Sequence, residues 1–502
     1  MSRICLCLTG KTLGRDLELL EKYRKLIDLA ELRVDCLDPD ERFLIRSFPE
    51  KAGVPVILTI RRKIDGGQYI GGEGARIALL SKGLAFADAN RRRNFAYIDI
   101  EEDLDVPSLE EAARTFGTRI IRSYHNLQGV DEDLSAKIRS LRRVGDEIVK
   151  TAVMPRSLED VIRIFRTAKE TAGIDKILLG MGYYGISTRI LTAWLGSHLT
   201  YAFAAGEPDI SPGAPGQLDP RELVKLYRFR EITPKTRLFG ITGFPLAVTS
   251  SPLFFNSVFS MENINAVYLP FPSNSIGVFL QLAEELGIGG ASITVPHKEA
   301  VLAALVFRSG SVQSIGACNT LVQGPEGWMG YNTDALGFSG SLLGFMKRKN
   351  LRREGVTIIG AGGVARAVAA EVFRLKGKAV ILNRTVARAR DLAAPYGFSW
   401  GRLDNQGLEL MEKHTDIIIQ TTSAGMEPEV DKDPLELYPF TGRELVMDII
   451  YRPEMTAFLK RARNAGCAVL NGHDMFLRQA RYQYSLFFKK EFPEQLMDRI
   501  KI

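Results

Sequence analysis

Short apolar runs recur along the first 200 or so residues, and each is followed by a polar or amphipathic stretch long enough for a helix. Apolar runs of this length, rich in β-branched residues, predict β-strands. Eight strands alternating with helices predict a (β/α)8 TIM barrel, in which functional residues lie at the C-terminal ends of the strands. The predicted strands are Ile4–Leu8, Leu29–Asp35, Val56–Arg61, Phe95–Glu101, Arg119–His125, Glu147–Val153, Lys176–Met181 and Leu199–Ala204.

Charged residues interrupt these strands at alternating positions, which places them on one face of each strand. Buried charges are costly without partners, so a barrel core would not carry this many for packing alone. We therefore expect most of them to face a functional site and one, Asp35, to have a structural role. The charged residues within the strands or at their ends are Glu31, Arg33, Asp35, Arg61, Asp99, Glu101 and His125.

Lys150 lies in EIVKTAVMP, with apolar neighbours on both sides. An apolar environment disfavours the ammonium form, so we expect a lowered pKa and a nucleophilic amine. The natural chemistry of such an amine is a Schiff base with a ketone. His125, at a neighbouring strand end, is a suitable proton carrier near neutral pH.

The second half begins after a linker at Ile232–Lys235 with a predicted strand, Arg237–Thr242. Further on, VTIIGAGGVARA predicts a buried strand, a tight glycine turn and a helix from about Val364. Glycines let a diphosphate approach the backbone, and the amides at the helix N-terminus favour its negative charge. A glycine turn alone is a weak signal, because many such turns bind nothing.

The next predicted strand, Lys378–Leu382, makes the cofactor assignment specific. It ends in Asn383-Arg384-Thr385. NAD sites usually have an acidic residue here for the ribose hydroxyl, whereas an arginine accommodates a 2′-phosphate. The sequence therefore predicts NADPH rather than NADH.

Other polar residues in the second half follow apolar strands or begin helices. GFPLAVTSSPLFFN predicts a turn with hydroxyl groups leading into a helix, where Thr249, Ser250 and Ser251 could bind a carboxylate. A lysine after a proline turn is usually a surface residue, so Lys298 carries little weight alone. The polar residues at strand ends are Lys298, Asn319 and Asp334.

Composition narrows the class of protein. The chain has 502 residues, of which 45% are hydrophobic, so it contains enough apolar material for two to four domains. No apolar run approaches a membrane span, and the opening MSRICLCLTG is too quickly polar for a secretory signal. Five cysteines without CxxC spacing favour reduced thiols in the cytoplasm, and the five histidines lack metal-binding spacing, so we predict no metal.

The formal net charge is +7, and the basic residues are spread along the chain. Two clusters, Arg91–Arg93 and Lys347–Arg353, lack the aromatic residues that usually accompany nucleic-acid binding. We expect no nucleic-acid or membrane partner. A positive charge instead suits acidic small molecules and a phosphorylated cofactor.

Several motifs of the first half occur in a fixed order: ELRVD, the strand ending at Arg61, YIDIE, SYHN, DEIVKTAVMP, MGYYGISTRILTAWLGSHLTYA and APGQL. With them, residues 1–228 resemble type I 3-dehydroquinate dehydratase. The resemblance implies that Lys150 forms an imine with the substrate ketone, that His125 transfers protons, and that Gln217 closes over the site on a loop. The other substrate-binding residues it implies are Glu31, Arg33, Arg61, Glu101 and Arg189.

A second ordered set consists of SITVPHKEA, GACNTL, YNTDALGF, GAGGVARA, NRT, TTSAGM, VMDIIYRPEMT and DMFLRQA. With it, residues 236–502 resemble shikimate dehydrogenase. The resemblance implies that Lys298 and Asp334 act at the hydride-transfer site, with Lys298 giving a proton to the ketone or stabilising its developing alkoxide. Implied substrate ligands are Thr249, Ser251, Asn319, Tyr451 and Gln479. Implied NADP ligands are Gly360, Ala361, Gly362, Gly363, Val364, Ala365, Asn383, Arg384, Thr385 and Thr422.

The two resemblances also imply the domain organisation. Residues 1–228 form the barrel, 236–346 a substrate-binding lobe completed by 474–502, and 350–473 a Rossmann NADP-binding lobe. We expect the second cleft between these two lobes. The chain departs from the families at Gly213 (usually Ser), Val248 and Thr249 (usually His and Ser), and Gln420 (often Asn).

The sequence thus predicts a bifunctional enzyme that dehydrates 3-dehydroquinate and reduces the product with NADPH to shikimate. One alternative is a second half that also acts on quinate. Another is a binding protein built on these folds with catalysis lost, since fold alone does not establish function. The sequence leaves the oligomeric state open.

Overall fold

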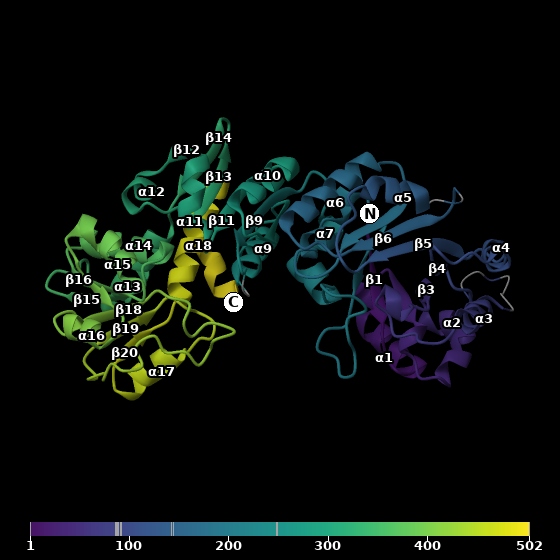
Figure 1. The fold of residues 1–502 in the computed structure, drawn as a ribbon, viewed down its shortest axis with the longest axis horizontal. Coiled ribbons are helices and arrows are strands. Elements are labelled where there is room, and N and C mark those ends of the chain that lie inside the picture. Colours follow the sequence, from purple (N-terminus) through teal and green to yellow (C-terminus); the bar gives the residue numbers. More distant parts are fainter. Residues whose placement is uncertain are drawn as a thin grey trace. The chain divides into compact units, whose positions relative to one another are not determined.

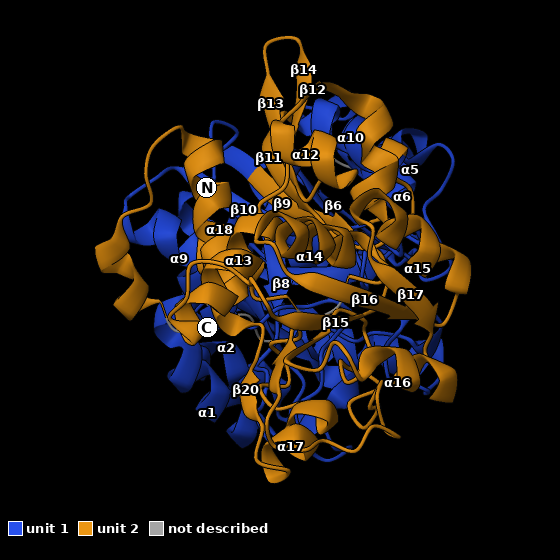
Figure 2. Ribbon diagram, turned by 90° about the vertical axis from the view of Figure 1, so that its left-hand side faces the viewer, with its two compact units in different colours: residues 1–238, 256–272, 278–286 blue, residues 239–255, 273–277, 287–502 orange. Residues whose placement is uncertain are grey.

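The computed structural model describes all residues except 1, 86–89, 91–92, 142, 144, 247–248 and 501–502. Arg91, Arg92 and Val248 of the sequence analysis thus lie outside the described residues. Contacts between Cα atoms divide the chain into two compact units, coloured separately in Figure 2. Unit 1 comprises residues 1–238, 256–272 and 278–286, and unit 2 comprises 239–255, 273–277 and 287–502.

Eight parallel strands form the barrel of unit 1 (Figure 1), as the apolar pattern predicts. Their order is β7-β6-β5-β4-β3-β2-β1-β8, and a single parallel bridge between Lys176 and Ser197 nearly closes the ring. The strands are β1 (Arg3–Leu8), β2 (Leu29–Arg33), β3 (Val56–Thr59), β4 (Tyr97–Glu101), β5 (Arg119–Asn126), β6 (Ile148–Val153), β7 (Lys176–Gly180) and β8 (Leu199–Ala202).

Helices follow these strands and bury one apolar stripe each. Helix α6 (Leu158–Glu170) is an example: Ser157 caps its first turn by accepting from the amide of Asp160. Its buried residues include Val161, Ile164 and Phe165, at the spacing of one helix face. The others are α1 (Leu13–Tyr23), α2 (Phe48–Ala52), α3 (Glu73–Leu84), α4 (Pro107–Thr115), α5 (Leu134–Leu141), α7 (Ile186–Ile190) and α8 (Thr192–Leu195).

The barrel interior changes character along its axis. Apolar residues such as Leu29, Ile57 and Ile148 form a buried cluster inside the barrel. Charged residues occupy the strand ends that follow, including Arg33, Glu101 and His125. The apolar cluster fills the barrel on the side away from the charged strand ends, and the charged side chains form the first candidate site.

A mixed six-stranded sheet follows the predicted linker, in the order β10-β9-β11-β13-β14-β12. Strand β13 pairs antiparallel with both β11 and β14. The strands are β9 (Arg237–Gly243), β10 (Ala266–Pro272), β11 (Ile288–Ile293), β12 (Leu305–Arg308), β13 (Thr320–Gly324) and β14 (Gly327–Tyr331). The helices of this part are α9 (Ser251–Met261), α10 (Ile276–Leu286), α11 (His297–Ala300), α12 (Gly310–Ile315) and α13 (Asp334–Met346).

The third sheet is wholly parallel, in the order β17-β16-β15-β18-β19-β20. Numbered along its own chain this order is 3-2-1-4-5-6, that of a Rossmann fold. Both faces of the central strand are buried: Ile358 joins one apolar cluster and Ile359 another. This explains why the strand is an uninterrupted apolar run.

The strands of this sheet are β15 (Gly355–Ile359), β16 (Lys378–Asn383), β17 (Ser399–Arg402), β18 (Ile417–Gln420), β19 (Leu445–Asp448) and β20 (Ala468–Leu470). Its helices are α14 (Gly363–Arg374), α15 (Val386–Ala393), α16 (Asn405–Met411) and α17 (Ala457–Asn464). The last long helix, α18 (His473–Phe488), packs against α13, β11 and β13 of the preceding sheet. Within the described residues, no helix is both long and apolar enough to cross a membrane.

Candidate functional site

A cavity of about 60 Å³ lies at the charged end of the barrel. Residues of the loop 213–217 form part of its wall. The cavity brings together seven of the predicted site residues of the first half, from strands β2, β5 and β6, the segment after β3, helix α7 and that loop. They are Glu31, Arg33, Arg61, His125, Lys150, Arg189 and Gln217.

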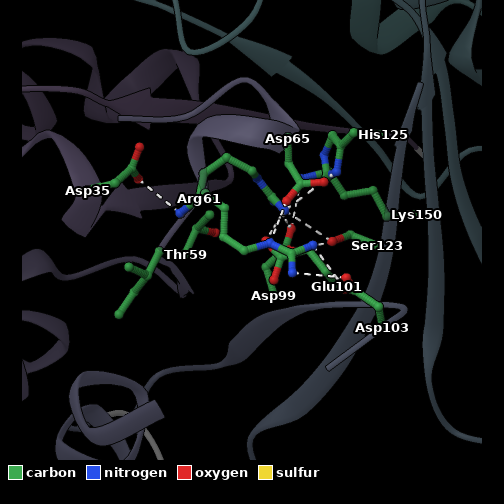
Figure 3. A network of polar contacts seen from close by, with 12 residues as sticks. Asp35, Thr59, Arg61, Asp65, Asp99, Glu101, Asp103, Ser123, His125 and Lys150 are labelled. Atoms are coloured by element: carbon green, nitrogen blue, oxygen red, sulfur yellow. Dashed lines mark hydrogen bonds and ion pairs between the residues drawn. The ribbon is translucent and has the colours of Figure 1, made fainter. Parts of the chain in front are cut away.

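Lys150 has carboxylate partners, so the expectation of an isolated lysine among apolar neighbours is wrong. Its Nζ donates to Asp99 Oδ2 at 2.8 Å (Figure 3). It also lies 3.6 Å from Glu31 Oε1. The ring of Tyr201 covers the ammonium, with its centroid 4.5 Å from Nζ. The sequence pattern missed these carboxylate partners because they come from β2 and β4, strands that do not adjoin β6, rather than from residues next to Lys150 in the chain.

Arg61 connects the carboxylates around Lys150. Its Nη2 lies 2.8 Å from Asp99 Oδ2, and its Nη1 lies 2.6 Å from Glu101 Oε1 (Figure 3). Burial alone would raise the pKa of Asp99, but the charges of Arg61 and Lys150 outweigh it and hold that pKa well below its usual range. Asp99 therefore stays ionised at neutral pH.

His125 is neutral at neutral pH. Burial lowers the pKa of His125 well below its ordinary value, and the positive charges of Arg61 and Lys150 lower it further. Arg61 Nη1 lies 3.5 Å from His125 Nδ1, at the limit of a hydrogen bond. A buried neutral imidazole beside Lys150 can accept a proton.

Asp35 has the contacts of a structural residue, in agreement with the sequence analysis. It receives two hydrogen bonds from the Arg33 guanidinium, at 2.9 and 2.8 Å. The backbone amides of Arg61 and Gln68 also donate to it. Asp35 thereby fixes Arg33 and the end of β3 against each other.

The loop over the barrel cavity is held by side chains predicted to bind substrate. Gln217 Oε1 accepts from the Gly213 amide at 2.8 Å, and Gln217 Nε2 donates to Cys7 Sγ at 3.1 Å. Arg33 Nη1 donates to the Gly213 carbonyl at 3.0 Å. The backbone of Gly213 thus makes polar contacts where the family usually has a serine.

Arg189 is 1% exposed, and its Nη2 donates to the Pro215 carbonyl at 3.0 Å. Its Nε and Nη1 have no hydrogen-bond partner among the residues that the structure describes. Burial lowers the pKa of Arg189 to about 10, which still leaves the guanidinium charged at neutral pH. A buried cation with unused donors fits a carboxylate.

A second cavity, of about 180 Å³, lies in unit 2. Lys298 and Asp334 meet in it: Lys298 Nζ donates to Asp334 Oδ2 at 2.5 Å, and both residues are buried. Val364 and Ile449 of the Rossmann part also line it. The other predicted residues in its wall are Thr249, Ser251, Asn319, Tyr451 and Gln479.

Asn319 fixes the second oxygen of Asp334. The backbone amide of Thr333 donates to Asn319 Oδ1 at 2.8 Å, which leaves Asn319 Nδ2 to donate to Asp334 Oδ1, also at 2.8 Å. Lys298 donates to the other oxygen of Asp334, so both carboxylate oxygens accept a hydrogen bond. Gln479 also belongs to this network, because its Oε1 accepts from the Thr333 hydroxyl at 3.3 Å.

Hydroxyl groups gather at the start of α9. Thr249 Oγ1 donates to Ser251 Oγ at 3.2 Å and accepts from the Ser251 amide at the same distance. The Tyr451 hydroxyl accepts from the Ser250 amide at 3.3 Å. This arrangement offers hydroxyl donors at a helix N-terminus, where a carboxylate is favoured.

The glycine turn after β15 leaves room for a ligand. Gly360 has a φ of +109°, and a Cβ there would lie 2.6 Å from Thr421 Oγ1, so only glycine fits. A Cβ at Gly362 would meet nothing within 4 Å. The amides of the first turn of α14 therefore face open space, as a bound diphosphate requires.

The other predicted cofactor residues lie at neighbouring strand ends of the same sheet. Asn383 ends β16, and its side chain donates to the Thr385 carbonyl at 2.9 Å. Gln420 ends β18 and holds the loop that contains Thr422, through bonds to the Thr422 and Ala424 carbonyls. Arg384 is exposed, so its guanidinium is accessible to the phosphate of a ligand that arrives from solvent.

The sequence analysis missed several residues of both sites. Cys7 contacts Gln217 and donates to Glu31, and Arg76 donates to Glu101 at 2.6 Å. In unit 2, Gln483 donates to Thr320, and Arg388 lies one helical turn after Arg384. Arg384 and Arg388 are four residues apart around the start of α15, and this spacing could have indicated Arg388 from the sequence. Other missed cavity residues include Tyr201, Ser292, Thr294, Met475 and Phe476.

Models of three protein families match consecutive parts of the chain. They are type I 3-dehydroquinase over residues 4–234, shikimate dehydrogenase substrate binding domain over 241–321, and shikimate / quinate 5-dehydrogenase over 343–451. The first match covers the part of the chain that forms the barrel cavity. The other two matches fall in the part that forms the second cavity.

Relatives of known name match either the whole chain or its second half. The bifunctional 3-dehydroquinate dehydratase/shikimate dehydrogenase, chloroplastic, of Arabidopsis thaliana is 32% identical over 492 residues, 93% of this chain and 79% of that protein. Shikimate biosynthesis protein AroDE of Chlamydia pneumoniae is 26% identical over 97% of this chain and 95% of that protein. Shikimate dehydrogenase (NADP(+)) of Moorella thermoacetica is 36% identical over 54% of this chain and 94% of that protein.

Proposed function

This chain belongs to the family of bifunctional 3-dehydroquinate dehydratases/shikimate dehydrogenases, and on that premise we propose which of its side chains carry the two reactions. It is a multifunctional enzyme of the shikimate pathway, with lyase and NADP-dependent oxidoreductase activities on small-molecule substrates. The product of the first reaction, 3-dehydroshikimate, is the substrate of the second.

The dehydratase reaction is assigned to Lys150 and His125. Neutral His125 accepts the proton of the Lys150 ammonium, and the free amine attacks the ketone carbon of 3-dehydroquinate. Loss of water from that adduct gives an iminium ion, which acidifies the neighbouring C–H bond. A base then removes this proton, hydroxide leaves with a proton as water, and hydrolysis of the imine releases the product and restores the lysine.

Arg61 and the carboxylates around it keep Lys150 in place for this attack. Asp99 holds the amine through a direct hydrogen bond of 2.8 Å, and Arg61 holds Asp99 and Glu101. Arg189, with two unused donors, is assigned to the substrate carboxylate. Arg33, Glu31 and Gln217 are assigned to the substrate hydroxyls and the loop above them.

The dehydrogenase reaction is assigned to Lys298 and Asp334. When bound, NADPH supplies the hydride that reduces the ketone carbon. Lys298 gives its proton to the ketone oxygen, and Asp334, held at both oxygens, keeps the ammonium in position. Thr249 and Ser251 are assigned to the carboxylate, Asn319 and Gln479 to the ring hydroxyls, and Tyr451 to the border of the site.

The residues at the second site fit an NADP molecule. Gly360 permits the turn and Gly362 leaves open space at the N-terminus of α14, where a diphosphate is favoured. Arg384 and Arg388 are exposed one helical turn apart and suit a 2′-phosphate. The remaining assigned residues are Ala361, Gly363, Val364, Ala365, Asn383, Thr385 and Thr422.

We assign the domains as a barrel over residues 1–228, a substrate-binding lobe over 236–346 completed by 474–502, and an NADP-binding lobe over 350–473. The packing of α18 against α13, β11 and β13 supports the return of the chain to the substrate-binding lobe. All five cysteines are free and buried, which supports a reducing compartment such as the cytoplasm. Thiol titration of the unfolded protein should find five thiols, and fewer would contradict this assignment.

The observation that carries the assignment is the presence of two separate buried lysine–carboxylate pairs, Lys150–Asp99 and Lys298–Asp334, whose lysines line different cavities. The two activities should therefore be separable. We expect Lys150→Ala to abolish dehydration of 3-dehydroquinate and to spare reduction of 3-dehydroshikimate, and Lys298→Ala to do the reverse. Each loss should exceed about a thousandfold in kcat, because each lysine acts directly on the substrate.

The measurement is NADPH oxidation by purified protein supplied with either substrate, together with direct detection of 3-dehydroshikimate. Each variant serves as the folding control for the other activity. If one substitution removed both activities from folded protein, the division into two independent sites would be wrong. If the wild-type protein oxidised NADPH with neither substrate, both site assignments would fail.

A further inference from the structure

The stem of Lys298 lies directly against the first residue of helix α14. A Cβ added at Gly363 would lie 2.9 Å from Lys298 Cδ, 3.1 Å from its Cβ and 3.4 Å from its Cγ. Favourable contacts between carbon atoms begin at about 3.5 Å, so any larger residue would have to displace the lysine or the helix. At Gly362, one residue earlier, an added Cβ would meet nothing within 4 Å.

The same face of α14 contacts the segment that carries Asp334. Ala367 follows Gly363 by one helical turn and packs in a buried cluster with Ala317 and Ala335. Ala335 is the neighbour of Asp334 in the chain. Small residues on α14 therefore allow the helix to approach both members of the lysine–carboxylate pair closely.

An ion pair links the two elements a second time. Arg366, three residues after Gly363, places its Nη2 3.0 Å from Oε2 of Glu299, the residue after Lys298. Both side chains are partly exposed, so this pair contributes little stability by itself. The ion pair nevertheless agrees with the Gly363 contact, because Gly363 and Arg366 are three residues apart and therefore lie on the same face of α14.

We propose that Gly363, besides the backbone contact assigned to it at the NADP site, is a positioning residue for Lys298. The absence of a side chain at Gly363 seats the lysine stem so that its amine reaches Asp334 at 2.5 Å. Because Lys298 is only 7% exposed, a displaced stem has little free space, and the amine would leave its position beside Asp334. The proposal rests on the assignment of Lys298 as proton donor. It adds that the turn assigned to the diphosphate also positions this lysine.

The kinetic test compares Gly363→Ala with Gly362→Ala. We expect Gly363→Ala to lower kcat for 3-dehydroshikimate reduction by about tenfold to a hundredfold, since a misplacement of about 1 Å costs that much. Its dissociation constant for NADPH, measured by fluorescence titration, should stay within about threefold of wild type. Gly362→Ala should instead weaken NADPH binding, because its Cβ would enter the space left for the diphosphate. Dehydration of 3-dehydroquinate by the barrel serves as the folding control for both variants.

A second measurement does not depend on activity. Substitution of Gly363 by alanine should lower the melting temperature more in wild type than in Lys298→Ala protein, because the latter lacks the Cγ and Cδ atoms that the new methyl group meets. Unchanged kcat in Gly363→Ala, or a loss of NADPH affinity equal to that of Gly362→Ala, would overturn the proposal. An equal loss of melting temperature in both backgrounds would also overturn it. If wild-type protein failed to reduce 3-dehydroshikimate, the proposed function would fail, and the melting temperatures would still decide whether Gly363 seats Lys298.

Discussion

Carboxylates and the Tyr201 ring surround the ammonium group of Lys150, and under the proposed assignment this determines how the amine becomes a nucleophile. Asp99 accepts from Lys150 and is also paired with Arg61, so the carboxylate is held ionised. It therefore stabilises the ammonium and does not take its proton. Neutral His125 in the same cavity is left as the proton acceptor.

The charge of Arg61 should control the pH at which His125 works. Burial and then Arg61 lower the pKa of His125, so the acid limb of kcat/KM for dehydration should lie below the ordinary histidine value of about 6.5. Arg61→Gln removes a positive charge and leaves Asp99 and Glu101, which favour the imidazolium. The pKa of His125 should therefore rise, and the acid limb should move to higher pH.

Arg62→Gln is the matched control for this change, because Arg62 is paired with Asp65 and Asp103 instead. The measurement is the pH dependence of kcat/KM rather than its height, since Arg61→Gln should also weaken substrate binding. An acid limb at the same pH in wild type and Arg61→Gln would show that the charge of Arg61 does not set the His125 pKa.

Gly213 is a second residue whose environment makes a specific prediction. A Cβ there would lie 3.0 Å from Arg33 Nη1 and 3.3 Å from Cys7 Sγ. Asp35 holds Arg33 with two hydrogen bonds, so the guanidinium cannot easily move away. Gly213→Ala should therefore displace the loop with Gln217 and raise the KM for 3-dehydroquinate by about tenfold, a typical effect of overpacking.

Gly129→Ala provides the control for Gly213→Ala, because a Cβ at Gly129 would meet nothing within 4 Å. Both substitutions add one methyl group to unit 1, and the measurement is the initial rate of dehydration at several substrate concentrations. A Gly213→Ala enzyme with the wild-type KM would mean that the loop can accommodate a side chain without moving Arg33 or Cys7.

At the scale of elements, β15, β16 and their following turns form the cofactor end of the second site. The apolar strand β15 places Gly360 and Gly362 at its C-terminal end, and β16 places Asn383 beside them. Ligands bind at this end of parallel sheets because the strand order reverses there. Within this group, Arg384 is the residue that we predict to distinguish the two nicotinamide cofactors.

Arg384→Asp should raise the KM for NADPH by at least about tenfold and change the KM for NADH much less, since an Arg–phosphate pair is replaced by repulsion between like charges. Arg390→Asp on α15, the helix that follows Arg384, is the control, because Arg390 is exposed and paired with Asp391. Initial rates of 3-dehydroshikimate reduction with each cofactor provide the measurement. An equal loss with NADPH and NADH would contradict recognition of the 2′-phosphate by Arg384.

At the scale of the whole molecule, each unit contains a buried carboxyl group with a raised pKa. Burial raises the pKa of Asp16 in unit 1 to about 7, and it raises the pKa of Asp448 in unit 2 to about 7 as well. A group whose pKa is raised on folding stabilises the protein fully below its unfolded pKa and loses that contribution as pH rises through the folded value. Both groups should therefore favour folding more at pH 5 than at pH 8.

Asp16→Asn tests this pH dependence. Asparagine is neutral at every pH, so the melting temperature of Asp16→Asn relative to wild type should be at least about 2 °C more favourable at pH 8 than at pH 5. Asp38→Asn, at an exposed aspartate of the same unit, is the control. If the difference between Asp16→Asn and wild type were the same at both pH values, Asp16 would titrate alike in the folded and unfolded chain.

The sequence by itself determined the elements and the chemistry that local patterns encode. The eight barrel strands follow from apolar runs, and the Rossmann strand and its glycine turn follow from VTIIGAGGV, because both signals lie within a few consecutive residues. Ordered motifs also identified Lys150 and Lys298, together with His125 and Asp334. In the structure, Lys150 and His125 line one cavity, and Lys298 and Asp334 line the other.

Only the tertiary structure decided which groups surround those residues. Arg61 meets Glu101 40 residues away, Gln217 meets Cys7 210 residues away, and Gly363 meets the stem of Lys298. Contacts of the same kind, from Lys150 to Asp99 and Glu31, overturned the expectation of an apolar environment for Lys150. Their physical reason is that burial and electrostatic partners depend on how strands and helices pack, and a pattern of neighbouring residues carries no information about side chains that arrive from distant parts of the chain.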